Sequence, residues 1–87
     1  MSTLPMETND TNDWKLYPNS SNFSGMVQNG CDYPIYLYVT ASGATPAEPN
    51  GVVLKGGIGE SLPVSIPDTE ELHFKPVTKG PVKLRLA

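Results

Sequence analysis

The chain has 87 residues, with six basic and nine acidic side chains and a formal net charge of −3. Leu, Ile, Val and Phe supply 20 of these residues, which is enough for one small domain with a thin core. No run of about 18 apolar residues is present, which argues against a membrane-spanning helix. The chain does not open with a basic and then an apolar stretch, so we expect no secretory signal peptide. A single Cys excludes an internal disulfide.

Residues 1–24 differ in composition from the rest of the chain. They are rich in Asn, Asp, Ser and Thr and show neither a helical nor a strand period. Pro5 and Pro18 interrupt any regular element in this stretch. We therefore predict an extended N-terminal arm over residues 1–24, followed by a small β-domain over residues 25–87.

Three apolar side chains lie close together in the predicted arm: Trp14, Leu16 and Tyr17. Aromatic side chains often supply most of the binding energy of an interface, so we expect these three residues to contact a partner. The sequence leaves a second interpretation open, in which Trp14 folds back onto its own domain and closes the small core.

The rest of the chain reads as short strands separated by turn signals, with no helical period. The predicted strands cover residues 25–28, 35–40, 51–54, 60–66, 71–77 and 82–86. Pro63 cannot donate a ladder hydrogen bond, so its strand is expected at a sheet edge or at a bulge. The predicted fold class is all-β, a small antiparallel β-sandwich or open barrel of five to six short strands with an extended N-terminal arm.

The alternation within these strands separates a core face from an outer face. The predicted core consists of Ile35, Leu37, Val39, Val53, Leu62, Val64, Ile66, Leu72, Phe74, Val82, Leu84 and Leu86. In the clearest strand, Tyr36 and Tyr38 alternate with the core residues and therefore face outward. We expect a partner subunit or a second sheet to cover these two tyrosines.

Charge is distributed unevenly along the chain. All nine acidic residues lie in residues 1–71, whereas residues 72–87 hold four basic residues and no acidic one. This polarity allows docking between identical copies. The alternative is that the basic side chains are outward positions of edge strands, where Lys commonly prevents unwanted pairing.

No catalytic, metal-binding or cofactor-binding motif is present. His73 is the only histidine, and no Ser or Asp spacing gives it the partner that a general base needs. Cys31 lies beside Asp32, which disfavours a reactive thiolate, so a small, partly buried thiol is expected. Glu70 and Glu71 are adjacent on a strand and point to opposite faces. We therefore predict a protein that is not an enzyme and that has no cofactor and no metal site.

Outward aromatic side chains can also bind single-stranded nucleic acid when basic residues lie beside them. The strand that carries Tyr36 and Tyr38 has no Lys or Arg, so nucleic acid is not the favoured partner. An antiparallel sheet can still bring the basic strands next to it, and nucleic-acid binding remains an alternative.

The segment from Asn29 to Val39, a turn followed by a Tyr-rich strand, resembles the opening of small β-domains in virion proteins of tailed bacteriophages. The strand from Gly59 to Val64 and the closing segment from Lys79 to Leu86 are similar to later parts of such domains. The resemblance spans roughly residues 27–87 and is one of strands and turns. It implies a structural role in the virion, as a capsid decoration or cement protein or as a small head or tail component.

Together these observations predict a non-enzymatic structural protein of a viral particle. It binds the shell through its β-domain and its N-terminal arm, with Trp14, Leu16, Tyr17, Tyr36 and Tyr38 as partner-binding residues. The expected partners are the major capsid protein or other virion subunits, and copies of itself, without a membrane. The expected location is the capsid of the virion, after synthesis in the host cytoplasm. The alternative is a small β-domain that binds a host protein or single-stranded nucleic acid.

Overall fold

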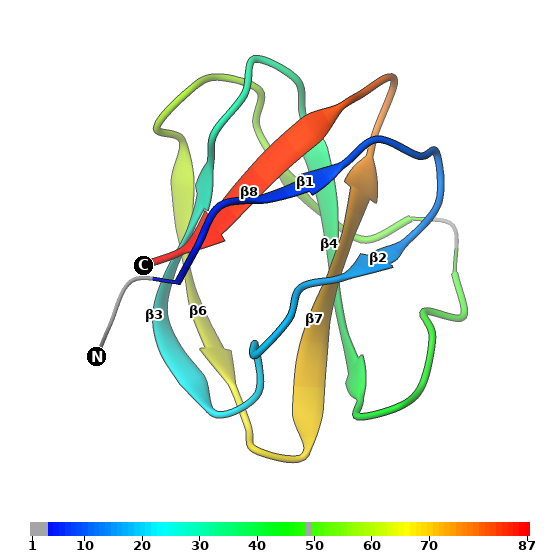
Figure 1. The fold of residues 1–87 in the computed structure, drawn as a ribbon, viewed down its shortest axis with the longest axis vertical. Coiled ribbons are helices and arrows are strands. Elements are labelled where there is room, and N and C mark those ends of the chain that lie inside the picture. Colours follow the sequence, from blue (N-terminus) through cyan, green and yellow to red (C-terminus); the bar gives the residue numbers. More distant parts are fainter. Residues whose placement is uncertain (1–3, 49) are drawn as a thin grey trace.

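A computed structural model describes residues 4–48 and 50–87 of the chain. This part forms eight strands and no helix, arranged as two four-stranded antiparallel sheets (Figure 1). Sheet A contains, in spatial order, β1 (Glu7–Asn9), β8 (Val82–Leu86), β3 (Phe23–Asn29) and β6 (Ser61–Ile66). Sheet B contains β2 (Lys15–Leu16), β7 (Glu70–Pro76), β4 (Ile35–Ala41) and β5 (Val52–Leu54). The predicted all-β antiparallel architecture is confirmed, but the predicted number of five to six strands is wrong.

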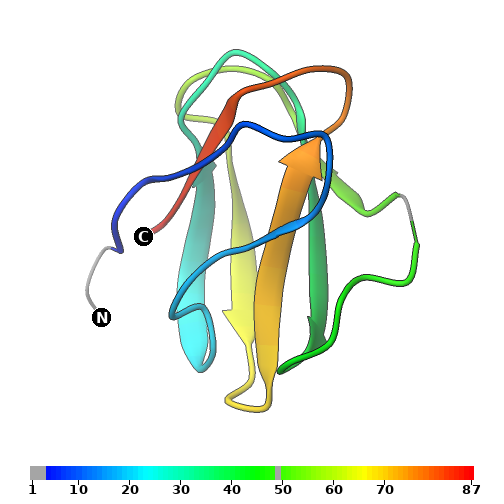
Figure 2. The ribbon, with the colours of Figure 1, turned by 45° about the vertical axis from the view of Figure 1, so that its right-hand side comes forward.

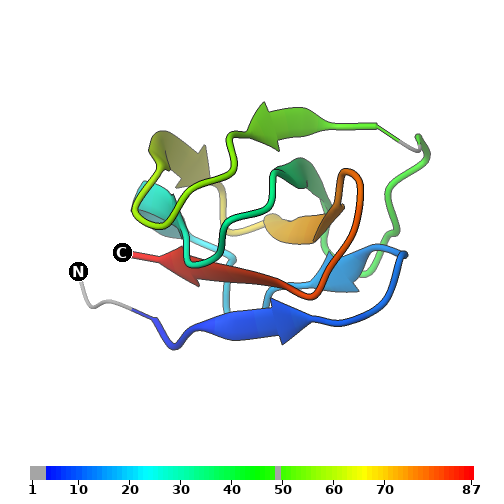
Figure 3. The ribbon, with the colours of Figure 1, turned by 90° about the horizontal axis from the view of Figure 1, so that it is seen from above.

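The two sheets lie against each other with the apolar core between them. Seen from above, β1 and β2 lie on one side of the molecule and β5 and β6 on the opposite side (Figure 3). The connection between β4 and β5 stands away from the body, at the right of the view in Figure 2. The molecule therefore has one side closed by its N-terminal segment and one side bounded by the edge strands β5 and β6.

The described residues of the predicted arm lie on their own domain. In β1, Thr8 pairs antiparallel with Lys83 of β8, and in β2, Leu16 pairs antiparallel with His73 of β7. These two short strands are the additional strands that the sequence did not indicate. Of the two alternatives for the arm, the structure has the one in which the segment folds back, but Tyr17 and not Trp14 enters the core.

Tyr17 fixes this segment in the core. It is 1% exposed, and its ring centroid lies 6.2 Å from that of Phe74. The backbone N–H of Tyr17 donates to Leu72 of sheet B. Its hydroxyl accepts from the N–H of Leu86 in sheet A at 3.3 Å and donates to the carbonyl of Pro5. The prediction that Tyr17 contacts a partner is therefore wrong, because the side chain joins the two sheets from inside.

Most of the predicted core is buried: Ile35, Leu37, Ile66, Leu72, Phe74, Val82, Leu84 and Leu86. Leu62 and Val64 are half-buried against it. The prediction that Val53 belongs to the core is wrong, because its side chain is 51% exposed. Val53 pairs with Tyr36 on the outer face, and the inward positions of β5 are Val52 and Leu54. Val39 points inward but is 37% exposed, since β5 ends before it can cover that end of β4. The core residues that the sequence did not indicate are Tyr17, Phe23, Val27 and Leu54.

A buried asparagine ends β1 and holds the crossing from sheet A to sheet B. The Oδ1 of Asn9 accepts from the backbone N–H and the hydroxyl of Thr11, at 2.9 and 2.8 Å. Its Nδ2 donates to the carbonyls of Asp13 and Phe74, at 2.8 and 2.9 Å. All the hydrogen-bonding groups of this amide are used, which offsets the cost of burying it.

The end of β3 repeats this arrangement. The Oδ1 of Asn29 accepts from the backbone N–H and the Sγ of Cys31, at 2.9 and 3.1 Å. Its Nδ2 donates to the carbonyls of Tyr33 and Lys55, at 2.9 and 2.8 Å. Each asparagine thus receives two bonds from residue i+2 and donates one to residue i+4. The same local device turns the chain from sheet A to sheet B twice.

The basic residues of the C-terminal segment do not form one charged edge. Lys83 lies on the outer face of sheet A, opposite Thr8, and Arg85 lies on the same face, opposite Gln28. Lys75 lies in sheet B, and the Nζ of Lys79 lies 5.3 Å from the ring centroid of Tyr33. The structure therefore favours outward positions of strands and turns over a docking polarity between copies.

We expect Tyr17→Phe to lower the free energy of unfolding by about 1–2 kcal/mol, because the buried N–H of Leu86 loses its acceptor. In a domain of this size each kcal/mol corresponds to a fall of roughly 4–8 °C in Tm. Urea unfolding followed by circular dichroism measures the change. Tyr36→Phe is the matched control, because the Tyr36 side chain is half-buried on the outside of sheet B. An equal effect of the two substitutions would contradict the role assigned to the Tyr17 hydroxyl.

Candidate protein-binding face

The outer face of sheet B gathers aromatic side chains that are far apart in the sequence. Tyr36 pairs with Lys75, and Tyr38 pairs with His73, which on its other side pairs with Leu16 of β2. Trp14, two positions before Leu16, projects on the same face. Four of the five predicted partner-binding residues therefore meet here, and only Tyr17 does not. We call this the aromatic face, formed by Trp14, Leu16, Tyr36, Tyr38 and Lys75.

The rings of the aromatic face are held by specific contacts. The centroids of Trp14 and Tyr38 lie 5.7 Å apart at an interplanar angle of 64°, an edge-to-face arrangement. The indole N–H of Trp14 donates to the carbonyl of Glu48 at 3.1 Å. Trp14 thus connects the N-terminal segment with the loop between β4 and β5, and its ring is held in one orientation.

Lys75 completes the face, although the sequence did not assign it to the site. Its Nζ lies 4.9 Å from the ring centroid of Trp14 and 5.9 Å from that of Tyr36, a cation–π arrangement with two rings. Lys75 alternates with the buried Phe74, so the strand period predicts that its side chain points outward. The strand period cannot predict the strand order, which places β7 between β2 and β4.

His73 lies on the same face but is covered. It is 5% exposed between Leu16 and Tyr38, and its Nδ1 lies 3.4 Å from the hydroxyl of Thr40. Burial lowers the pKa of His73 below its ordinary value of 6.5, and the charge of Glu71 opposes this shift in part. Thr40 is itself 8% exposed, so this pair is closed to a substrate. The position suits packing rather than acid–base chemistry.

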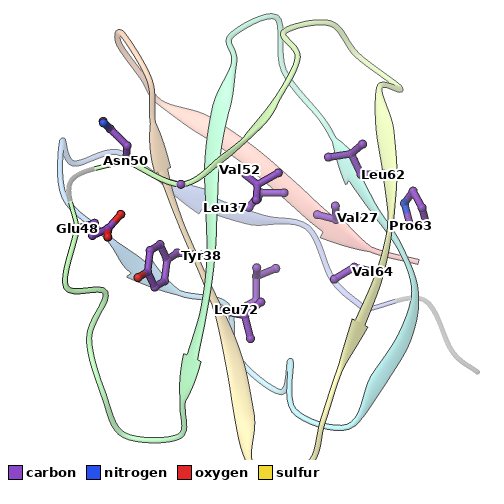
Figure 4. Close-up of a pocket in the computed structure, with 12 residues that line it drawn as sticks. Val27, Leu37, Tyr38, Glu48, Asn50, Val52, Leu62, Pro63, Val64 and Leu72 are labelled. Atoms are coloured by element: carbon purple, nitrogen blue, oxygen red, sulfur yellow. The ribbon is translucent and has the colours of Figure 1, made fainter.

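A second feature adjoins the aromatic face on the side bounded by β5 and β6. An open groove of about 580 Å³ lies there, and Figure 4 shows it between β4 and β6. Its lining is mostly apolar and consists of Val27, Leu37, Tyr38, Val39, Glu48, Asn50, Gly51, Val52, Leu62, Pro63, Val64 and Leu72. Tyr38 and Glu48 belong to the surroundings of both features, so the groove and the aromatic face share a border.

Searches of protein-family models, of curated proteins and of solved structures found no match for this chain. Residues 4–48 and 50–87 contain no helix long and apolar enough to cross a membrane. Within those same residues, no three side chains of the His, Cys, Asp or Glu type come together as a metal site would need.

We expect the folded protein to lose stability as the pH falls through the range set by His73. Its folded pKa lies below the unfolded value of 6.5, so the unfolded chain takes up the proton first. The contribution of neutral His73 to the free energy of unfolding is complete above pH 6.5 and is lost as the pH falls through the lower folded pKa. Urea unfolding at several pH values, compared with His73→Gln, isolates this contribution from that of the carboxylates. A His73→Gln variant with the same pH dependence as the wild type would contradict the assignment.

Proposed function

We propose that this chain is a non-enzymatic structural protein of a viral particle, of the capsid decoration or cement type, that attaches to a shell subunit through its aromatic face. The observation that carries the proposal is the gathering of Trp14, Tyr36 and Tyr38 on one face beside an exposed Leu16. Aromatic rings held in fixed orientations lose little conformational freedom when a partner covers them, and they are frequent hot spots of interfaces.

Two further arguments support a structural role in an assembly. A chain of this length buries a small core and often gains stability from association. The resemblance of residues 27–87 to β-domains of tailed-bacteriophage virion proteins favours a shell as the partner. Many copies on one shell would turn a modest affinity per copy into firm attachment. The proposed location is the capsid, and the proposed partner is the major capsid protein or another virion subunit.

The contact is assigned to a face of the folded domain rather than to a free arm. Residues 7–9 and 15–16 are edge strands of the two sheets, and Tyr17 lies in the core. A deletion of residues 1–24 would therefore remove parts of the fold along with any binding residue. Point substitutions on the outer faces give a sharper test.

We expect Leu16→Asp to weaken attachment to the particle at least about tenfold, because it places a charge in the contact. Met26→Asp is the matched control: Leu16 is 40% exposed on sheet B, and Met26 is 44% exposed on the outer face of sheet A. Quantitative mass spectrometry of purified particles gives the copy number of each variant. Wild-type protein in simple ratio to the shell protein, with loss of Leu16→Asp alone, is the expected result. Absence of the wild-type protein from the particle would overturn the proposal.

The second candidate function is binding of single-stranded nucleic acid by the same face. The observation that favours it is Lys75, whose ammonium lies near both Trp14 and Tyr36. A basic residue among aromatic rings is the combination that single-strand binders use. One cation gives few phosphate contacts, which is why the protein partner comes first.

Trp14 is the single tryptophan of the chain, so its fluorescence reports directly on the aromatic face. Under the first proposal we expect no saturable change when a single-stranded oligonucleotide is added. Nucleic-acid binding would instead give saturable quenching that weakens with salt and is lost in Lys75→Ala. That result would replace the protein partner with nucleic acid.

A further inference from the structure

The outer edge of β6 presents backbone groups beside the groove. Met26 and Ala87 exchange both backbone hydrogen bonds on the β8 side of β3, whereas Asn29 donates to Glu60 on the β6 side. The backbone groups of odd-numbered residues of β3 therefore form hydrogen bonds with β6, where their partners are Leu62 and Val64. By the same alternation, the backbone N–H and C=O groups at Ser61, Pro63 and Ser65 point away from β3, toward the open edge of sheet A. In the described chain no strand lies beside that edge.

The walls of the groove have the spacing of an extended chain. Leu62 and Val64 face it from β6, and Leu37 faces it from β4 (Figure 4). Val39, two residues after Leu37, also belongs to the lining. Side chains two positions apart on a strand point to the same face. An extended segment running along β6 would therefore place every second side chain against these walls. Val52, which is 62% exposed at the rim, would be covered by the same segment.

We propose that the groove binds an extended polypeptide segment of another protein, which adds to β6 as a strand and inserts alternate apolar side chains between the two sheets. Main-chain bonds to Ser61, Pro63 and Ser65 supply the pairing, and the apolar pockets supply the selectivity. The segment closes the side of the sandwich that the N-terminal segment leaves open. The residues that pair with the added strand and line its inner face, Leu62, Pro63 and Val64, lie outside the aromatic face, although Tyr38 borders both surfaces.

Two observations decide between occupants of the groove. Glu48 is the only charged residue among the described lining residues, so the groove offers no cation for a phosphate or another anion. Pro63 lies in the middle of the open edge and has no N–H. Symmetric antiparallel pairing with a second copy about this residue would place proline opposite proline, without a donor on either strand. A segment of a different protein meets this constraint at one strand only, and its own N–H can donate to the Pro63 carbonyl.

The test is a selection from a yeast-displayed library of random peptides on the intact protein. The structure offers a matched pair of variants, because Val52 and Val53 are adjacent, both exposed, and on opposite faces of β5. We expect enriched peptides with apolar residues at alternate positions. They should bind wild type, Val53→Asp and Leu16→Asp alike, and Val52→Asp at least about tenfold more weakly. Bound peptide should slow the amide hydrogen exchange of Ser61 and Ser65, measured by NMR.

Several results would overturn this proposal while leaving the aromatic face untouched. One is the absence of any enriched peptide, or enrichment without alternation. Another is equal binding to Val52→Asp, and a third is unchanged exchange at Ser61 and Ser65, which would mean docking without strand addition. Concentration-dependent dimerisation that Val52→Asp abolishes would assign the groove to a second copy instead. Loss of peptide binding in Leu16→Asp would move the contact to the aromatic face.

Discussion

The arrangement of the whole molecule depends on how Tyr17 spans the core. Its backbone is bonded to Leu72 in one sheet, and its hydroxyl meets Leu86 in the other. A single residue thereby ties the two sheets together and fixes the N-terminal segment along their edges. The position of Trp14 and Leu16 on the outside follows from this anchor, because residues that alternate with a buried tyrosine must point outward. The aromatic face is thus a consequence of core packing, and the same segment serves stability on one side and recognition on the other.

The crossings between the sheets rest on a second, local constraint. Asn9 and Asn29 each end a strand of sheet A, and each satisfies four hydrogen bonds with an equivalent set of neighbours. Burying two uncharged amides is tolerated because none of their groups is left unpaired. The β1–β2 and β3–β4 units therefore turn in the same way, although β1 and β2 are much shorter. No repeat is visible in the residue types themselves, since a threonine in one turn corresponds to a cysteine in the other.

Alternation along the chain predicted the strands that have enough residues to show it, and it predicted the outward direction of Tyr36 and Tyr38. It could not indicate β1 and β2, which are only three and two residues long. Their extended state comes from pairing with β8 and β7, more than 50 residues away. Val53 was misplaced for the same reason, because a three-residue strand has no period to read. The alternation of Trp14 and Leu16 with Tyr17 was present in the sequence, but it becomes informative only once residue 17 is known to be buried.

The aromatic face and the groove are joined through the loop between β4 and β5. Trp14 holds this loop by its bond to the Glu48 carbonyl, and the loop in turn supplies Glu48, Asn50 and Gly51 to the groove. At Gly51 the backbone approaches β4 so closely that a Cβ would clash with the carbonyl oxygen of Leu37. Only glycine permits this approach at the rim of the groove. Glu48 and Gly51 are therefore two points at which this loop is held, one by the aromatic face and one at the rim of the groove, so the two surfaces share the same support.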